Sequence, residues 1–394
     1  MSVRMSVNNM TFEQAATLLN AVHSQVTGRQ QIAPTDVTDF ISVAQKTLKA
    51  GYDPVLNAIS QVVGRTIFSV RPYDAKFKGI QADAQKWGSI TRKLVVADKP
   101  LQDNKAFNLV DGQSVDMYEV NKPEVLQFNY YGALTFTKSF TIFRSQLDNA
   151  FKGPEEFGQF MAMVMQNASD MIEQTKESCA RLTLGNFIAG KIAATSDVIH
   201  LLTEYNTETG LTLTATTVKD PANFPAFIKW AYARIATLTN MMTERSAKYQ
   251  IQVTGSEVMR HTPFERQKVY LLNWLLNNID ARVLGDTYNY KFLEFADVEA
   301  VNYWQAIDDP DEINITPVYL DSATGGLIEA QNAVNQTNVM GVIFDDEALG
   351  FTSMNEFSGI TPMNVRGEYW NQYFNYVLRY WNDFTEKGIV LLLD

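Results

Sequence analysis

A long amphipathic segment begins at Pro154 and reaches about residue 185. Proline in the first turn, followed by Glu155 and Glu156, is typical of a helix N-terminus, because the first N–H groups need no partner within the helix and carboxylates favour the positive end of its dipole. Apolar residues then recur at steps of three and four, with polar residues on the opposite face. Nothing after Gly158 breaks this pattern before Gly185, so the sequence predicts one helix about 45 Å long.

The single cysteine, Cys179, lies on the apolar stripe of this helix. This position predicts a buried structural thiol and not a nucleophile. One cysteine excludes a disulfide within the chain and suits a reducing compartment. The three histidines, His23, His200 and His261, are isolated from one another, which argues against a histidine-rich metal site.

Composition places the chain among ordinary folded proteins. Its 394 residues are enough for two or three cores, and 46% are hydrophobic against 20% charged. No segment is apolar for long enough to span a bilayer, and the first residues lack the apolar core of a signal peptide. The net charge of -11 is uneven, because residues 285–394 hold 18 acidic and 4 basic side chains. A basic and an acidic segment can attract one another between copies, although solvated surface explains both.

Three helices are predicted before residue 66. The first begins at Thr11 with a capping-box pattern, the second covers 35–50, and Asp53 with Pro54 begins the third. Residues 66–70 then have the composition of a strand.

The stretch from Arg71 to about Tyr131 has weak periodicity, frequent turn residues and charges of alternating sign. Candidate strands at 93–98 and 114–120 flank a turn signal at 111–113. The aromatic and β-branched content argues against disorder. The sequence therefore predicts an extended two-stranded arm that packs against something outside its own domain.

Later segments predict a mixture of strands and helices. Strand residues cover 132–147, and a helix begins near Asn223. Residues 249–255 are predicted as a short strand, and an apolar helix is predicted for 262–279. Residues 338–347 are predicted as a strand that ends in carboxylates.

Motifs for catalysis or metal binding are scarce. The acidic runs 308–312 and 345–347 have oxygen ligands for a divalent cation, but neither has EF-hand spacing, so both are interpreted as solvated turns. The stretch 322–326 is interpreted as a turn, because no Gly-Lys-Ser/Thr follows it. A paired-carboxylate hydrolase stays open, since such pairs meet only in the fold. No catalytic residue, metal ligand or cofactor is predicted.

Residues 366–384 contain eight aromatic side chains among nineteen residues. Helical and strand spacing each fit in part, so periodicity leaves the choice open, but the density of aromatic residues favours a strand. One face of that strand would carry large side chains, namely Trp370, Phe374, Tyr376, Leu378 and Tyr380. We expect this face to pack beneath the long helix.

The order of these elements resembles that of the major capsid proteins of tailed bacteriophages (Caudoviricetes), which have the Hong Kong 97-like fold. The stretch 363–393, with its Arg-Gly, Tyr-Trp-Asn and aromatic-rich sequence, is similar to the closing segment of capsid proteins from small short-tailed phages. The stretch 135–167 is similar to the junction between the extended loop and the spine helix in that family. The resemblance covers about residues 65–394 and implies an α+β fold.

The resemblance also implies a division of the chain by segment. Residues 1–65 would be an N-terminal arm, 66–135 the extended loop, 136–248 the peripheral domain with the spine helix at about 154–185, 249–340 the axial domain, and 341–394 the C-terminal strands that return to the peripheral domain. The loop supplies candidates for contacts between subunits: Lys76, Lys78, Lys86, Trp87, Arg92, Lys93, Lys99 and Lys105. Some family members crosslink through a loop lysine, and these lysines qualify by residue type alone.

The implied function is that of a structural, non-enzymatic protein of the virion capsid. Copies would self-assemble as pentamers and hexamers of an icosahedral shell around double-stranded DNA, without sequence-specific contact and without a membrane. Since only about sixty-five residues precede the loop, we expect a separate scaffolding protein, with a portal protein as a further partner and assembly in the host cytoplasm. Two alternatives stay open: an encapsulin-like shell around enzyme cargo, and an acidic carboxylate-dependent hydrolase.

Overall fold

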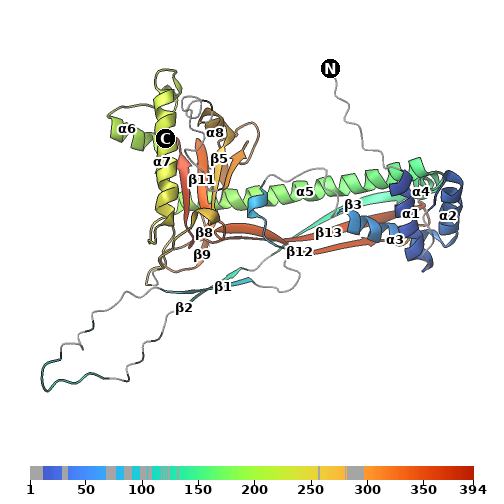
Figure 1. Cartoon of the computed structure of the whole chain (residues 1–394), viewed down its shortest axis with the longest axis horizontal. Helices are drawn as coiled ribbons and strands as arrows, with labels where there is room; N and C mark the ends of the chain where they lie inside the picture. The colour runs from blue at the N-terminus through green and yellow to red at the C-terminus, as the bar shows by residue number, and fades with distance from the viewer. Residues whose placement is uncertain are drawn as a thin grey trace.

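The computed structural model describes residues 12–28, 34–67, 77–83, 91–97, 104, 109–116, 118, 120, 122, 125–130, 133–255, 258–279, 281 and 297–394. One long helix, α5, connects a cluster of helices at one end to a mixed helix and sheet unit at the other, and a narrow ribbon leaves the body between them (Figure 1). Among the described residues, no helix combines the length and the apolar character needed to cross a membrane.

Helix α5 covers Pro154–Ala193 and has 40 residues, which corresponds to about 60 Å. The prediction of its start is confirmed, but the predicted end at Gly185 is wrong. A methyl group on Gly185 would lie 2.6 Å from Ile315, and one on Gly190 would lie 2.5 Å from the ring of Phe384. These glycines therefore allow neighbouring side chains to pack closely against the helix and do not end it.

The N-terminal helices pack together against the first part of α5. They are α1 (Phe12–Thr27), α2 (Val37–Lys49) and α3 (Tyr52–Ile67), and the short helix α4 (Arg144–Ala150) lies beside them (Figure 1). The Asp36 carboxylate caps α2 by accepting the N–H of Asp39 at 2.8 Å. Three helices were expected here and three are present, but the strand expected at 66–70 is wrong in its first part, since α3 continues to Ile67. Residues 68–70 lie outside the described residues.

A three-stranded antiparallel sheet lies along α5 (Figure 1). Its order is β12 (Leu349–Ile360), β13 (Tyr369–Asn382) and β3 (Leu134–Phe143). The aromatic stretch is thus a strand, as its composition favours. The strand predicted at 132–147 is correct as far as Phe143, after which the chain turns into α4.

A second, five-stranded sheet lies at the other end of α5. Its order is β4 (Val198–His200), β14 (Gly388–Leu392), β11 (Val339–Asp345), β5 (Gln267–Leu272) and β6 (Asp297–Val301). Helices α6 (Leu201–Thr209), α7 (Phe224–Thr243) and α8 (Asn273–Ile279) lie beside this sheet (Figure 1). The C-terminal strands are therefore divided between the two sheets.

Two predictions in this region are wrong. In place of the helix predicted for 262–279, the chain forms the strand β5 followed by the short helix α8. The strand forms because β5 pairs with β11 on one side and with β6 on the other, and its apolar residues are buried in that sheet. A short, continuous apolar run does not separate a buried strand from a helix by its periodicity. Residues 249–255 form no strand, although the N–H of Ile251 donates to the carbonyl of Phe384 at 2.8 Å.

Short ribbons complete the fold. They pair β7 (Ile313–Ile315) with β10 (Val334–Gln336), and β8 (Val318–Leu320) with β9 (Leu327–Glu329). The stretch 322–326 is the turn between β8 and β9, as predicted, and Asp321 stabilises it by accepting the N–H of Ala323 at 3.1 Å. Stacking of Phe187 on Phe384, with ring centroids 5.3 Å apart, joins α5 to the chain segment between the two sheets.

Candidate functional site

The projecting ribbon is a two-stranded antiparallel hairpin, here called the arm root. It consists of β1 (Thr91–Val96) and β2 (Val125–Tyr130), with Thr91 opposite Tyr130 and Val96 opposite Val125. Side chains alternate between its two faces, since the period of a strand is two. The inner face, toward the body, carries Lys93, Val95, Leu126, Phe128 and Tyr130, and the outer face carries Arg92, Leu94, Val96, Val125, Gln127 and Asn129.

A cluster of charges holds the inner face to the body. The Lys93 ammonium lies 2.7 Å from Asp383 Oδ2 and 3.3 Å from Glu347 Oε2, and it also contacts Glu386 Oε1. Asp383 and Glu386 are buried, whereas Glu347 is half-exposed. We call these four residues the root anchor.

The protonation states in the root anchor follow from its geometry. Burial disfavours the ammonium of Lys93, but the Asp383 and Glu386 carboxylates outweigh burial and raise its pKa. Burial likewise favours the neutral form of Asp383, but Lys93 and the hydrogen bonds from Thr385 outweigh burial and lower its pKa. The Thr385 hydroxyl and N–H donate to Asp383 Oδ1 at 2.5 and 2.9 Å. Burial, followed by the Asp383 carboxylate, raises the pKa of the Tyr130 phenol, which stays neutral.

A second group of ion pairs surrounds the root anchor. Arg260 Nη1 lies 2.9 Å from Glu386, and Arg266 lies within 3.0 Å of Asp345, Asp346 and Glu347. Asp345 is buried, and burial raises its pKa to about 6. The interpretation of 345–347 as a solvated turn is therefore wrong for Asp345. In the run 308–312, residues 308–310 are exposed, as interpreted, whereas Asp311 and Glu312 are half-buried.

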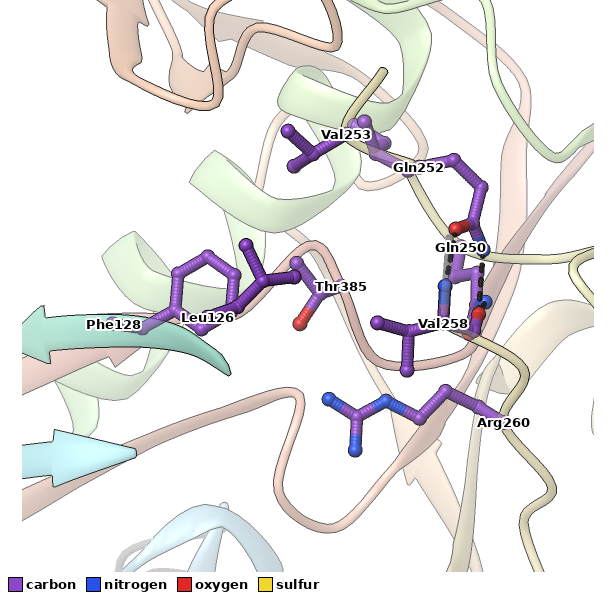
Figure 2. A pocket seen from close by; sticks show the side chains of 9 residues that line it. Leu126, Phe128, Gln250, Gln252, Val253, Val258, Arg260 and Thr385 are labelled. Carbon is purple, nitrogen blue, oxygen red and sulfur yellow. Dashed lines mark hydrogen bonds between the residues drawn. The ribbon is translucent and has the colours of Figure 1, made fainter. Parts of the chain in front are cut away.

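A small pocket lies between the arm root and the body, beside the root anchor. Figure 2 shows Leu126 and Phe128 of β2 on one side, with Val253, Val258 and Arg260 on the other. The lining is mainly apolar and comes from both the arm root and the chain after α7. Within the described ranges, no three His, Cys, Asp or Glu side chains are grouped so that they could hold a metal ion.

The outer face of the arm root is apolar and uncovered. The exposed fractions of Leu94, Val96 and Val125 are 67%, 58% and 53%. Val96 and Val125 are opposite one another across the two strands, so the three side chains form one patch, here called the outer patch. Clustered exposed apolar side chains of this kind mark interaction surfaces, whereas isolated ones do not.

Apolar exposure continues beyond the arm root. Residues 110–113 form a turn in which the N–H of Gln113 donates to the carbonyl of Val110 at 3.0 Å, and Gly112 takes a φ of +88°, which suits glycine. The turn was predicted, but the strand predicted at 114–120 is wrong where the chain is described, since residues 114–116, 118 and 120 belong to no strand. Val110, Tyr118 and Val120 are all exposed.

The candidate contact residues have different locations. Lys93 pairs with carboxylates of its own chain, and Arg92 lies exposed on the outer face. Lys78 begins a short 3-10 turn at Lys78–Ile80. Lys76, Lys86, Trp87, Lys99 and Lys105 lie outside the described residues. The outer patch was not among the candidates, because its residues cluster only once the register of β1 and β2 is known.

The aromatic strand β13 buries one face against α5, as expected. Trp370, Phe374, Tyr376 and Leu378 are buried, and the ammonium of Lys176 on α5 lies 5.9 Å from the centre of the Tyr376 ring. The prediction that Tyr380 continues this face is wrong. Tyr380 is 43% exposed, while its neighbour Arg379 is buried, so the alternation changes after Leu378. A β-bulge in the paired strand, between Ser353 and Asn355, lies beside this position.

Comparison with solved structures identifies the fold. The chain resembles the capsid structure of Staphylococcus phage Andhra with a TM-score of 0.55 and 11% identity, over 83% of this chain and 86% of that chain. It resembles a chain from the structure of the head fiber and inner core protein gp22 of bacteriophage P68 with a TM-score of 0.53 and 10% identity, over 82% and 85%. The fold is thus Hong Kong 97-like, as the resemblance implies.

Comparison with protein families and with curated proteins gives the second result. No curated protein sequence matches the chain. The model of the Phi29-like phage major capsid protein family matches residues 16–384, which is nearly the whole chain. The members of this family are structural proteins and not enzymes, which removes the support for a hydrolase. The chain therefore belongs to the family of Phi29-like phage major capsid proteins and is a structural protein of a phage capsid shell.

Proposed function

We propose that the arm lies across a neighbouring copy in the shell and that its outer patch is covered there. The observation that carries this proposal is the exposure of Leu94, Val96 and Val125 on one face of a ribbon whose other face is occupied by its own body. Full burial of one such side chain contributes about 1.5–3 kcal/mol. Three such side chains on one patch favour a contact with another molecule, because the single chain does not cover them.

A second copy of this chain is the occupant that we propose. The chain is a shell protein, so each copy has other copies as its neighbours. The outer patch is exposed in the single chain, which leaves it open to another molecule. In this arrangement, copies form pentamers and hexamers of an icosahedral shell around double-stranded DNA, without sequence-specific contact.

The division into domains follows the same proposal. Residues 1–65, which contain α1, α2 and most of α3, are the N-terminal arm, and 66–135 form the extended loop. Residues 136–248, with α5, form the peripheral domain, and 249–340, with β5, form the axial domain. Residues 341–394 are the C-terminal strands that return to the peripheral domain. A separate scaffolding protein and a portal protein are the further partners, and assembly takes place in the host cytoplasm.

The test is the double variant Leu94→Ser/Val96→Ser, produced with the neighbouring scaffold gene and imaged by negative-stain electron microscopy. We expect at least a tenfold loss of closed shells, while circular dichroism of the soluble chain stays unchanged. The matched control is Leu211→Ser, which changes an apolar residue exposed on the body and should leave shell yield at the unmodified level. Shells of the double variant at full yield would show that the outer patch is not an interface.

A further inference from the structure

The inner face of the arm root contacts the body through one charged side chain and several apolar ones. In β1 and β2 as described, Lys93 is the charged residue that faces inward, and its ammonium is largely buried. The apolar side chains of the inner face are Val95, which is buried, and Leu126 and Phe128, which are half-buried and border the pocket of Figure 2. Lys93 therefore makes the most specific contact between the arm root and the body.

The carboxylates that bind Lys93 come from two turns of the body. Asp383 and Glu386 belong to the turn between β13 and β14, which connects the two sheets, and Glu347 follows β11. The root anchor thus joins the arm root to the segment that connects the two sheets. A change in the relative position of the two sheets would therefore move the carboxylates that bind Lys93.

The carboxylates keep other partners when Lys93 is removed. Asp383 accepts two hydrogen bonds from Thr385, and Glu386 pairs with Arg260 at 2.9 Å. Glu347 pairs with Arg266 at 2.8 Å. Lysine binds as a point charge on a flexible chain and not through the rigid fork of arginine. The contact can therefore break without leaving the body's acidic groups unpartnered.

We infer that the root anchor is a releasable electrostatic joint: Lys93 sets the direction in which the arm leaves the body, and loss of that contact frees the arm while the body stays folded. The inference concerns a single chain and does not depend on what the outer patch binds. Removal of an apolar side chain from the inner face would weaken the attachment of the arm root to the body. The ion pairs of Lys93 would remain, so the direction of the arm would not change.

The experiment measures a distance between the arm root and the body in the unassembled full chain. Spin labels on Gln127→Cys in β2 and Thr237→Cys in α7 report this distance by pulsed electron paramagnetic resonance. Both positions are exposed and can therefore be labelled. The native Cys179 is buried, and burial raises its pKa to about 11, so its thiol stays unlabelled near neutral pH.

The variants are Lys93→Met and, as matched control on the outer face of the same strand, Arg92→Met. We expect a narrow distance distribution in the unmodified chain and in Arg92→Met, and a distribution at least twice as broad in Lys93→Met. Lys93→Arg, which keeps the charge, should restore most of the narrow distribution. Circular dichroism should show the same folded content and melting temperature, within a few degrees, in all of them.

A second neutral variant distinguishes loss of the Lys93 charge from misfolding caused by the methionine side chain. Lys93→Gln keeps a polar side chain beside the carboxylates, and we expect it to broaden the distribution as Lys93→Met does. If both neutral variants keep the narrow distribution of the unmodified chain, Lys93 does not set the direction of the arm and the inference is wrong. Shell assembly is not read out here, so failure of the joint and failure of the proposed interface are separate results.

Discussion

The sheet β12–β13–β3 and the arm root β1–β2 are both antiparallel ribbons with one face toward the body, but they are held in different ways. The sheet buries large aromatic side chains of β13 along α5. The arm root has a half-buried inner face centred on Lys93 and an exposed apolar outer face. The sheet is completed within one chain, whereas the arm root has apolar surface left for another molecule.

This difference separates two tasks within one subunit. Apolar burial is non-directional and strong, which suits a body that must keep its shape. An ion pair depends on the charge of both partners, so loss of one charge can release it, which suits an element that changes direction. The following changes test this contrast, starting with the largest expected effect.

Trp370→Ala should cost about 3–5 kcal/mol of unfolding free energy, as expected for removal of a large buried aromatic side chain. Trp370 is 1% exposed, its N–H donates to Asp53 at 2.6 Å, and its ring lies 5.9 Å from that of Tyr52. Chemical denaturation of the unassembled chain measures the loss. Tyr373→Ala, on the exposed face of the same strand, should cost less than about 1 kcal/mol. Equal losses for the two variants would contradict the view that the inner face carries the stability of the sheet.

Gly190→Ala should destabilise the body by about 1–3 kcal/mol, the usual range for overpacking. The added methyl group would lie 2.5 Å from Phe384 and 3.1 Å from Tyr319, which outweighs the helix preference of alanine of about 1 kcal/mol. Gly326→Ala is the control, because its nearest neighbour would be the Thr324 hydroxyl at 3.5 Å. Thermal melting compares the two variants, and a stabilised Gly190→Ala would show that the close packing relaxes without cost.

Acidification should release the arm root only below pH 3.8, after the buried Asp345 of the body has taken up its proton near pH 6. The pKa of Asp383 lies below its ordinary value of 3.8, so its contribution is fully present above pH 3.8 and is lost as pH falls through the lower, folded value. The pKa of Lys93 lies above 10.5, so its contribution is present below pH 10.5 and is lost as pH rises through the folded value. The groups that face this site also include Glu347, Glu386, Arg260 and Tyr130.

The spin-label distance measures this effect in the unmodified chain. It should stay narrow between pH 3.8 and 10.5 and broaden below that window, while Lys93→Met should be broad at every pH. Circular dichroism at each pH separates arm release from general unfolding. A broadening of the unmodified chain near pH 6, where Asp345 titrates, would instead assign control of the arm to the neighbouring Arg266 cluster.

Much of the body could be predicted from local patterns. The caps and apolar spacing of α2, α5 and α7 follow rules that act within a few residues, and the aromatic density of β13 indicates a strand. The wrong predictions arise where contacts with residues distant in the sequence determine the secondary structure. Gly185 lies inside a helix because Ile315 packs against it, and Val269 lies in a strand because β11 and β6 pair on either side.

The arm root could be predicted only in part for the same reason. A candidate strand was predicted at 93–98, close to β1, but the sequence does not reveal that Val96 lies opposite Val125 or that Lys93 meets Asp383, which is 290 positions away. The acidic residue Asp345 was interpreted as solvated, because nothing local indicates that Thr262 and Arg266 enclose it. Register and distant pairing are properties of the fold as a whole.

The pairing of β3 with β13 has a consequence for the newly made chain. Thr141 of β3 donates to Asn371 of β13, and Asp53 in α3 accepts from Trp370, so the sheet uses partners more than two hundred residues apart. Domains fold as their sequence emerges during synthesis, but β3 has no β13 to pair with until almost the entire chain has left the ribosome. Body formation is therefore a late, post-translational step, and nascent chains still on the ribosome lack the rigid sheet that shell-competent subunits contain.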